Sequence, residues 1–337
     1  MDASKISSQR LPDNLAEPNK MTRVIEGILD YEKTGTYSFN GEEQVKEFRV
    51  ENVTFSGLIG EPLVAKRSVM AAMKLLVDAG LRVGIFTNGV LMDESTWETI
   101  VRIAYVHLSL DAARGVTYGL LKYGNRLNGT AQFDQALNNL RNLVKFKENT
   151  PGSALEINAS FILYPENYRE VFEAAKILKD IGVTFFRVKR DISGQRLLTS
   201  DQKQEALKLL DRIRNELVGE GFQLVEIHRL NHEEEMERSF SRCLITELVA
   251  AIGSDGHLYP CNYHPRPGGA TYGSVIDATF REVWEGSKRK ETKQGIPRIC
   301  PAMCDPFKNR SNKLLAGLDS IYQERGLGTL ESYTNDL

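Results

Sequence analysis

Segments typical of strands and of helices alternate from about residue 48 to residue 221, and this alternation constrains the fold more than any other feature. Amphipathic helical segments separate five short apolar segments, which read, in chain order, FRVENVTFSG, RVGIFTNG, YVHLSLD, ALEINASFIL and VTFFRVKRD. Repeated β–α units with short connections predict parallel strands joined by crossover helices. The predicted fold class is therefore α/β, either a barrel or an open doubly wound sheet.

Single residues predict where several of these helices begin and end. Gly80 and Gly182 are expected to close two of them, and Asp93 is a candidate N-cap of a third. Ser200 or Asp201 is expected to cap the long helix that ends before residue 221.

Polar and glycine-containing segments follow four of the predicted strands, at residues 56–62, 87–89, 109–111 and 187–191. In both kinds of parallel sheet, ligands bind at the carboxyl ends of the strands, so we expect the functional site at this edge. Glu61 stands out because Gly60 precedes it and Pro62 follows it. Both neighbours constrain the backbone around one carboxylate.

Composition excludes several classes of partner. The 337 residues carry a formal charge of −2, which gives no support for a nucleic-acid or membrane-surface partner. No apolar run approaches the roughly 20 residues that span a bilayer. The first twenty residues lack the apolar core of a secretory signal. A cytoplasmic, reducing location is the expectation.

All four cysteines lie in the last third of the chain, at Cys243, Cys261, Cys300 and Cys304. A reducing compartment disfavours disulfides and favours metal binding or free thiols. Four thiolates can enclose one tetrahedral ion, such as structural zinc, or one iron–sulfur cluster. The tight Cys-x-x-Cys pairs of many zinc sites do not occur. A metal or cluster site is therefore favoured over buried free thiols and over disulfides.

The regular alternation of predicted strands and helices ends after residue 221. One more strand, FQLVEIHRL, is expected there, followed by a hairpin across GSDG, a helix in TFREVWEGSKRKETKQG and a helical tail. We therefore predict a barrel domain at residues 1–221, a smaller domain at 222–310 and a tail at 311–337.

Taken together, these residues resemble the radical S-adenosylmethionine (SAM) enzymes, in particular the subgroup with a C-terminal SPASM or twitch extension. SGLIGEP resembles the family's motif in its G-x-x-G-E-P form, and IFTNG and VHLSLD are similar to the strand ends that follow it. Cys243, Gly256 and Cys261 resemble the opening of the SPASM/twitch pattern, and GSVIDATFREVWEGSKR resembles its continuation. The single further cysteine pair fits the one-cluster twitch form. The resemblance covers about residues 21–310.

The resemblance implies a partial (β/α)₆ TIM-like barrel plus a small C-terminal twitch-like lobe that binds a cluster. It implies SAM as a cofactor, with Gly60 and Glu61 lining its amino group and Pro62 holding the turn. Ser109 and Asp111 would lie near the ribose or the substrate, or would simply cap the next helix. The turn at residues 87–89 is interpreted as a support for the neighbouring loop.

Further expectations concern the last strand and the cysteines. Arg187 and Lys189 share one face of the fifth strand and could hold an anionic substrate or the SAM carboxylate. In the polar run Glu156, Asn158 and Ser160, the side chains either point into the barrel or form a solvated face. The resemblance implies one auxiliary 4Fe–4S cluster held by the four cysteines.

The activity that the resemblance implies is reductive cleavage of SAM to a radical that modifies a peptide or small-molecule substrate, with a reductant protein as a further partner. The family's Cys-x-x-x-Cys-x-x-Cys loop has no counterpart here, because no cysteine precedes Cys243. MTRVIEGIL looks like the first crossover helix, so the barrel is expected to lack its first strand and to expose an edge at VENVTFS. Three interpretations follow. The chain is a truncated radical SAM enzyme, a degenerate non-catalytic iron–sulfur binding or partner protein, or, more weakly, a barrel enzyme with a structural zinc site.

Overall fold

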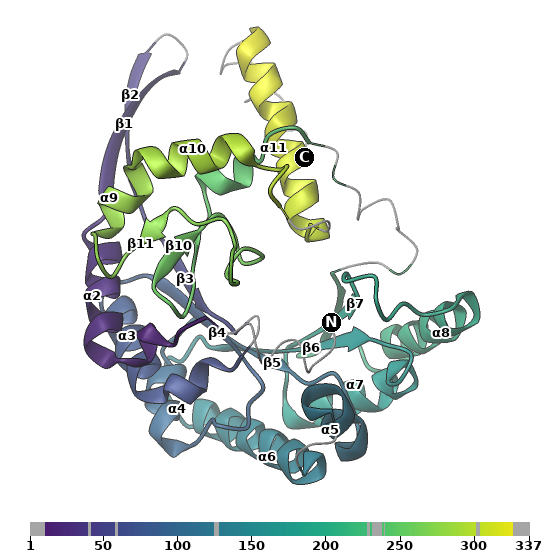
Figure 1. The fold of residues 1–337 in the computed structure, drawn as a ribbon. Coiled ribbons are helices and arrows are strands. Elements are labelled where there is room, and N and C mark those ends of the chain that lie inside the picture. Colours follow the sequence, from purple (N-terminus) through teal and green to yellow (C-terminus); the bar gives the residue numbers. More distant parts are fainter. Residues whose placement is uncertain are drawn as a thin grey trace. The chain divides into compact units, whose positions relative to one another are not determined.

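The computed structural model describes residues 11–39, 42–57, 60–124, 128–227, 230, 238, 240–300 and 304–325 (Figure 1). These residues form two compact units. The barrel unit contains the described part of Asn52–His232, and the C-terminal unit combines the described parts of Gln9–Glu51 and Glu233–Leu337. This division differs from the predicted one, because residues up to Glu51 group with the C-terminal part of the chain and not with the barrel.

The barrel unit is built on a sheet of six parallel strands in the order β3-β4-β5-β6-β7-β8. The strands are β3 (Asn52–Phe55), β4 (Arg82–Thr87), β5 (Tyr105–Ser109), β6 (Glu156–Leu163), β7 (Phe185–Arg190) and β8 (Gln223–Glu226). The α/β class and the parallel pairing are confirmed, and β3 lies at the sheet edge. Since β8 pairs with β7, the sheet continues past residue 222, the predicted boundary.

Helices cover one face of this sheet (Figure 1). They are α3 (Lys66–Asp78), α4 (Glu94–Ile100), α5 (Gly115–Tyr123), α6 (Gly129–Glu148), α7 (Val171–Ile181) and α8 (Ser200–Glu216). In the four central strands, alternate residues on the covered face are mostly apolar and buried, as in Ile85, Val106, Leu108, Ile157 and Phe186. Period-two burial of this kind fixes which face of each strand meets the helices.

The helix ends follow local capping chemistry. Asp93 caps α4 as predicted, and its side chain accepts a hydrogen bond from the backbone N–H of Ser95. The cap of α8 is Thr199, not Ser200 or Asp201, because the Thr199 hydroxyl and the Gln202 side chain form a reciprocal capping box. Gly182 ends α7 in the left-handed conformation that glycine adopts at least cost.

The C-terminal unit starts with the short helix η1 (Asn14–Ala16), followed by α2 (Pro18–Leu29) and a long hairpin of β1 (Glu32–Phe39) and β2 (Glu42–Arg49). The predicted first strand, FRVENVTFSG, is therefore divided. Its start belongs to this antiparallel hairpin, and only residues 52–55 join the parallel sheet. The helix expected to be the first barrel crossover, α2, instead contacts α9 (Phe280–Glu285) of its own unit. Tyr31, just after α2, packs edge-on against Phe280 with ring centroids 5.3 Å apart.

The rest of this unit is a small antiparallel sheet with helices. Its strands are β9 (Ala251–Ile252), β10 (His257–Tyr259) and β11 (Gly273–Ser274), and its helices include η5 (Leu244–Glu247), α10 (Ser287–Gly295) and α11 (Pro306–Arg325). The GSDG hairpin is confirmed, because β9 pairs with β10 across a turn in which Gly256 has φ +77°.

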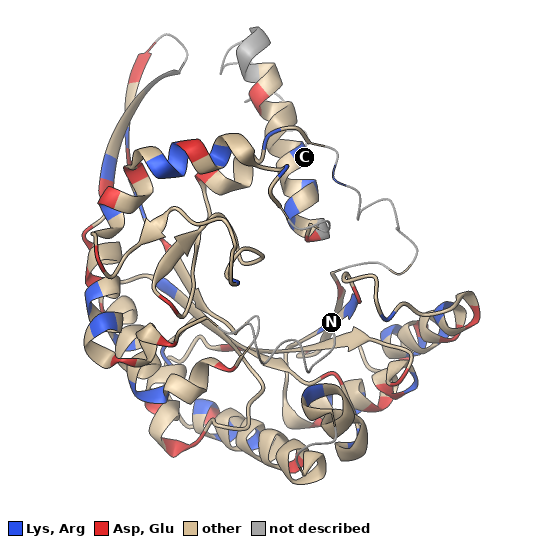
Figure 2. Cartoon of the chain, viewed as in Figure 1, with Lys and Arg blue, Asp and Glu red and all other residues tan. Residues whose placement is uncertain are grey.

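Two properties of the whole described chain bear on its partners. Acidic and basic residues both occur along the outer helices, as on α8 (Figure 2). Among the helices that the structure describes, none combines the length and the apolar character needed to cross a membrane.

Candidate functional site

Glu61 is held at the carboxyl end of the sheet by three hydrogen bonds. Its Oε1 accepts from the backbone N–H of Leu63 at 3.1 Å and from the Thr87 hydroxyl at 2.7 Å. Its Oε2 accepts from the backbone N–H of Asn88 at 2.7 Å. The first bond caps the short helix η2 (Pro62–Ala65), and the other two tie the carboxylate to the end of β4. The carboxylate is thus oriented by the protein, and Oε2, which accepts one hydrogen bond, retains a lone pair for a further donor.

The backbone around this carboxylate is tightly turned. A Cβ atom on Gly57 would lie 2.1 Å from the carbonyl oxygen of Gly60, so the turn requires glycine at residue 57. Gly60 itself has open space at the Cβ position and is exposed. Pro62 is the first residue of η2 and so fixes the exit from the turn. An open backbone beside a fixed carboxylate is a suitable docking point for an ammonium group.

The turn at residues 87–89 supports Glu61, in agreement with its interpretation as a supporting turn. Besides the two bonds to Glu61, the turn is held by the buried Asn139, whose amide donates to the carbonyls of Gly89 at 2.9 Å and of Val90 at 3.0 Å. Gly89 has φ +79°, which a side chain would disfavour. Glu61 therefore joins the ends of β3 and β4, and Asn139 of α6 holds the turn after β4 from the other side.

Asp111 is buried, and each of its carboxylate oxygens has a partner within the barrel unit. Its Oδ1 accepts from the backbone N–H of Ile162 at 2.7 Å, and its Oδ2 pairs with Lys122 of α5. Its own carbonyl accepts from the Asn167 amide at 2.7 Å, and its φ of 57° is positive for a non-glycine residue. The structure therefore gives Asp111 the role of joining β5, β6 and α5.

Ser109 ends β5 and is half-buried opposite Ser160 of β6. Neither Ser109 nor Asp111 caps the next helix, because the N-cap position of α5 is Arg114 and shows no side-chain cap. The helix-cap alternative is therefore wrong for both residues. Ser109 stays on the sheet face opposite the helices, where a bound ligand would meet it.

The sequence did not single out two further buried groups of the barrel unit. Glu170 accepts hydrogen bonds from the backbone N–H of Ala113 at 2.8 Å and from the Thr117 hydroxyl at 2.5 Å. His107 of β5 is fully buried, and neither of its ring nitrogens has a hydrogen-bond partner in the described part of the chain. Burial, followed by the charges of Lys189 and Arg187, holds the pKa of His107 well below its usual range, so the ring is neutral. Its place among alternating polar residues of the YVHLS strand was the available signal.

The four cysteines of the C-terminal unit line one small pocket of about 40 Å³. Cys243 precedes η5, Cys261 follows β10, Cys300 follows α10 and Cys304 precedes α11. All four are free thiols. The sequence therefore identified side chains that converge from four separate places in the fold.

Burial is the main cause of the shifted pKa values of Cys300 and Cys304. It raises the pKa of Cys300 and of Cys304 to about 11, and neighbouring thiols add to the effect, chiefly Cys261 for the former and Cys243 for the latter. The Cys300 and Cys304 thiols are thus protonated at neutral pH, and metal binding would release their protons. Within the described ranges, no three His, Cys, Asp or Glu side chains are grouped as ligands of a single ion.

His264 is a further member of the cysteine pocket that the sequence analysis did not include. It is 1% exposed, and its Nε2 lies 3.6 Å from the sulfur of Cys300. Burial, followed by the charges of Arg266 and Lys308, lowers its pKa, so the ring is neutral. A neutral imidazole can donate an N–H to a thiolate sulfur.

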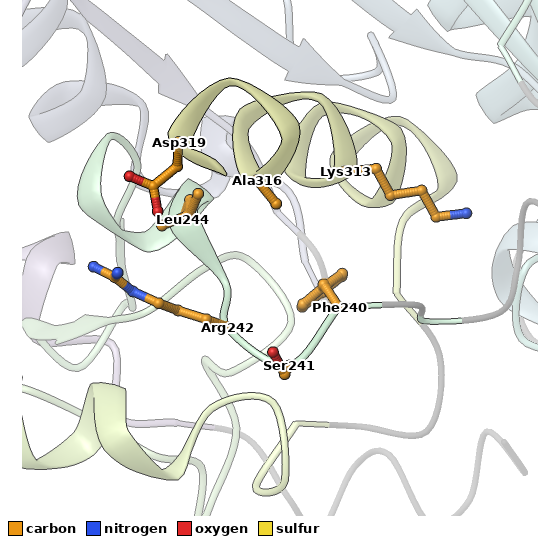
Figure 3. A pocket seen from close by; sticks show the side chains of 7 residues that line it. All are labelled: Phe240, Ser241, Arg242, Leu244, Lys313, Ala316 and Asp319. Atoms are coloured by element: carbon orange, nitrogen blue, oxygen red, sulfur yellow. The ribbon is translucent and has the colours of Figure 1, made fainter. Parts of the chain in front are cut away.

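A larger, open pocket of about 440 Å³ lies beside the segment that leads into η5 (Figure 3). The residues around it are Phe240, Ser241, Arg242, Leu244, Lys313, Ala316 and Asp319. In Figure 3 the charged ends of Arg242 and Lys313 point away from each other. These two cations therefore do not converge on one ligand position, and Phe240 lines both this pocket and the cysteine pocket.

No family model matches the chain. No curated protein matches its sequence. Solved structures do match its fold. SuiB of Streptococcus suis bound to S-adenosylmethionine is 14% identical, with a TM-score of 0.54 over 83% of this chain and 60% of that chain. The protein anSMEcpe with bound AdoMet and the Kp18Cys peptide is 17% identical, with a TM-score of 0.53 over 86% of this chain and 81% of that chain.

These comparisons concern the fold, because the identities are low. The chain spans 60% of the length of SuiB. Its six-stranded parallel sheet and covering helices have the fold of proteins whose structures contain S-adenosylmethionine. This is the α/β class that the sequence predicted, with its strands in one parallel sheet.

Proposed function

We propose that this chain is a radical SAM-type protein whose barrel unit binds SAM and whose C-terminal unit holds one 4Fe–4S cluster in a twitch-like lobe. The observation that carries the proposal is the convergence of Cys243, Cys261, Cys300 and Cys304 on one pocket. It occurs in a chain that has the fold of SAM-bound SuiB and anSMEcpe.

The cysteine pocket suits a cluster better than a single zinc ion. A structural zinc site needs its four ligands at about 2.0–2.3 Å from one point. No group of that kind occurs among the described residues, although all four thiols line the pocket. A cluster is larger than one ion and accepts four thiolates at its corners. When bound, it would supply electron transfer or an anchoring point for substrate.

In the barrel unit, Glu61 would receive the SAM ammonium beside the exposed backbone of Gly60, and Pro62 would hold the turn. The support is the fixed orientation of the carboxylate by Leu63, Thr87 and Asn88. Ser109 would face the ribose or the substrate, since it lies on the sheet face that the helices leave uncovered. Asp111 would act indirectly, by positioning the end of β5.

A peptide is the favoured substrate, ahead of a small molecule, and a reductant protein is a further partner. SuiB has been solved with its precursor peptide SuiA, and anSMEcpe with peptides. The absence of any cysteine before Cys243 favours a second candidate, a binding or partner protein that holds SAM and the cluster without cleaving SAM.

SAM binding to the full chain tests the barrel assignment directly. Isothermal titration should detect binding, and Glu61→Gln should weaken it about 10- to 100-fold, because hydrogen bonds to charged groups contribute roughly 1.5–3 kcal/mol. Glu98→Gln, a change at an exposed residue of α4, is the matched control and should bind like the parent chain. Equal affinity of the parent chain and Glu61→Gln would reject this site.

A further inference from the structure

The sheet face opposite the covering helices carries two buried polar residues side by side. His107 of β5 is the register partner of Asn158 of β6, and Phe86 and Phe185 continue the same row on β4 and β7. Both polar residues are 0% exposed. Strand alternation places them opposite the apolar face that packs against the helices.

Among the residues that the structure describes, four polar atoms of this pair have no hydrogen-bond partner. They are both ring nitrogens of His107 and both amide atoms of Asn158. The two side chains are neighbours across the strands and yet do not satisfy each other. Buried polar groups without partners are few in native proteins, because each costs free energy that a partner would recover. Such a pair indicates a ligand that brings both donors and acceptors.

The same face is positively charged next to the pair. Arg187 and Lys189 of β7 pair in register with Ser160 and Ile162, which follow Asn158 on the same side of β6. The charges of Lys189 and Arg187 both lower the pKa of His107, after burial. Lys189 Nζ lies 5.9 Å from the ring centroid of Phe86, and this ring packs against the imidazole. Glu156 is the acidic residue of β6 on this face. The end of the face nearest the strand termini is therefore basic.

We propose that His107, Asn158, Arg187 and Lys189 form a recognition site for an acidic residue of a peptide substrate. The proposal rests on the proposed function, since it specifies the peptide. A peptide group offers one N–H and one carbonyl, which match the donor and acceptor of the Asn158 amide and of a neutral imidazole. The carboxylate of the acidic residue matches the guanidinium and ammonium groups.

Binding of two synthetic peptides to the full chain tests this site without cluster or SAM. The probes are acetyl-Ala-Glu-Ala-amide and acetyl-Ala-Gln-Ala-amide, followed by ligand-observed NMR titration. The parent chain should prefer the glutamate peptide by about tenfold, the size of one charge-assisted hydrogen bond. Arg187→Met with Lys189→Met should remove the preference, and Asn158→Leu should weaken both peptides alike. Lys74→Met, on an exposed position of α3, is the control and should keep the preference.

Two outcomes would overturn the site. One is a parent chain that binds both peptides equally. The other is an Arg187→Met, Lys189→Met chain that keeps its peptide preference but loses SAM affinity, because the carboxylate would then be that of SAM. Because the peptides are titrated without SAM, failure of SAM binding alone would reject the Glu61 site and leave this one standing.

Thermal unfolding separates a ligand site from a structural pair. Replacing both residues with leucine, in His107→Leu with Asn158→Leu, should raise Tm by a few degrees while abolishing peptide binding, because four unpaired polar atoms are removed from the apo protein. A fall in Tm of several degrees would mean that the pair is satisfied within the fold, and the site would be rejected.

Discussion

The backbone N–H of Asn88 donates a hydrogen bond of 2.7 Å to Oε2 of Glu61, so the turn after β4 holds the carboxylate that follows β3. The Thr87 hydroxyl donates to the other oxygen at the same distance. Two neighbouring strand ends are thereby joined through one side chain. Glu61 is positioned by its neighbours before any ligand arrives, which lowers the cost of ligand binding.

The buried hydroxyl of Thr87 should contribute measurably to stability. It donates to Glu61 and accepts from the backbone N–H of Gly89 at 3.0 Å, so Thr87→Val removes one of the hydrogen bonds to Glu61 and the acceptor of the Gly89 N–H. We expect a loss of about 1–3 kcal/mol in the free energy of unfolding, measured by urea denaturation. Thr87→Ser keeps the hydroxyl and should recover most of the loss. Equal stability of Thr87→Val and the parent chain would contradict this role.

Asp191 should give the barrel unit a pH-dependent contribution to stability. Burial raises its pKa, but the hydroxyl and backbone N–H of Ser193 and the backbone N–H groups of Arg196 and Gln195 outweigh burial, so the pKa lies below its usual range. A lowered folded-state pKa stabilises fully above the unfolded value of about 3.9, and the contribution is lost as the pH falls through the folded value.

Asp191→Asn should therefore be less stable than the parent chain at pH 7, and the difference should shrink below about pH 4. Urea denaturation at several pH values measures it. Asp180→Asn, at an exposed position of α7, should show no such convergence. A difference that stays constant with pH would show that the charge of Asp191 does not matter.

Helices α5 and α6 approach closely at two glycines. A Cβ atom on Gly129 would lie 2.1 Å from the Cα of Gly119, so Gly129→Ala must push the helices apart. We expect a loss of about 1–3 kcal/mol or more, as for overpacked interiors, and a lower urea midpoint. Gly219→Ala is the control, because a Cβ there meets no atom within 4 Å. A stable Gly129→Ala protein would contradict the close approach.

Local pattern predicted most of the barrel unit, because strand and helix periods and short connections leave few topologies. The same reasoning found the GSDG hairpin and the four cysteines. It assigned α2 to the barrel, whereas α2 belongs to the C-terminal unit. An amphipathic pattern shows that a helix packs against other elements, but it does not show which ones. The buried residues of α2, Met21, Val24, Ile25 and Ile28, would suit the barrel as well as they suit α9. His107 was missed because its lack of partners depends on register with β6, which no single strand shows.

The chain as given should not cleave SAM. The reaction needs an iron with an open coordination position, and a cluster held by four cysteines has none. No other cysteine exists in the chain to hold a second cluster. Anaerobic incubation with SAM and dithionite, followed by chromatography for 5′-deoxyadenosine, should give no product above a no-protein control. Product above that control would mean that one of the four cysteines is not a cluster ligand.

A fused upstream strand with a three-cysteine loop distinguishes the two candidate functions. If the chain is part of an active enzyme, this addition should start 5′-deoxyadenosine formation. If the fused protein binds iron and SAM and yet forms no product, the non-cleaving binding protein is the better interpretation.

Metal content after anaerobic reconstitution with ferrous iron and sulfide tests the central claim most directly. The account predicts about four iron atoms per chain, the content of one cluster held by four thiolates. Cys300→Ala should lose most of this iron, whereas Ser241→Ala, in the neighbouring open pocket, should keep it. One zinc per chain with no iron, or full iron in Cys300→Ala, would contradict the account.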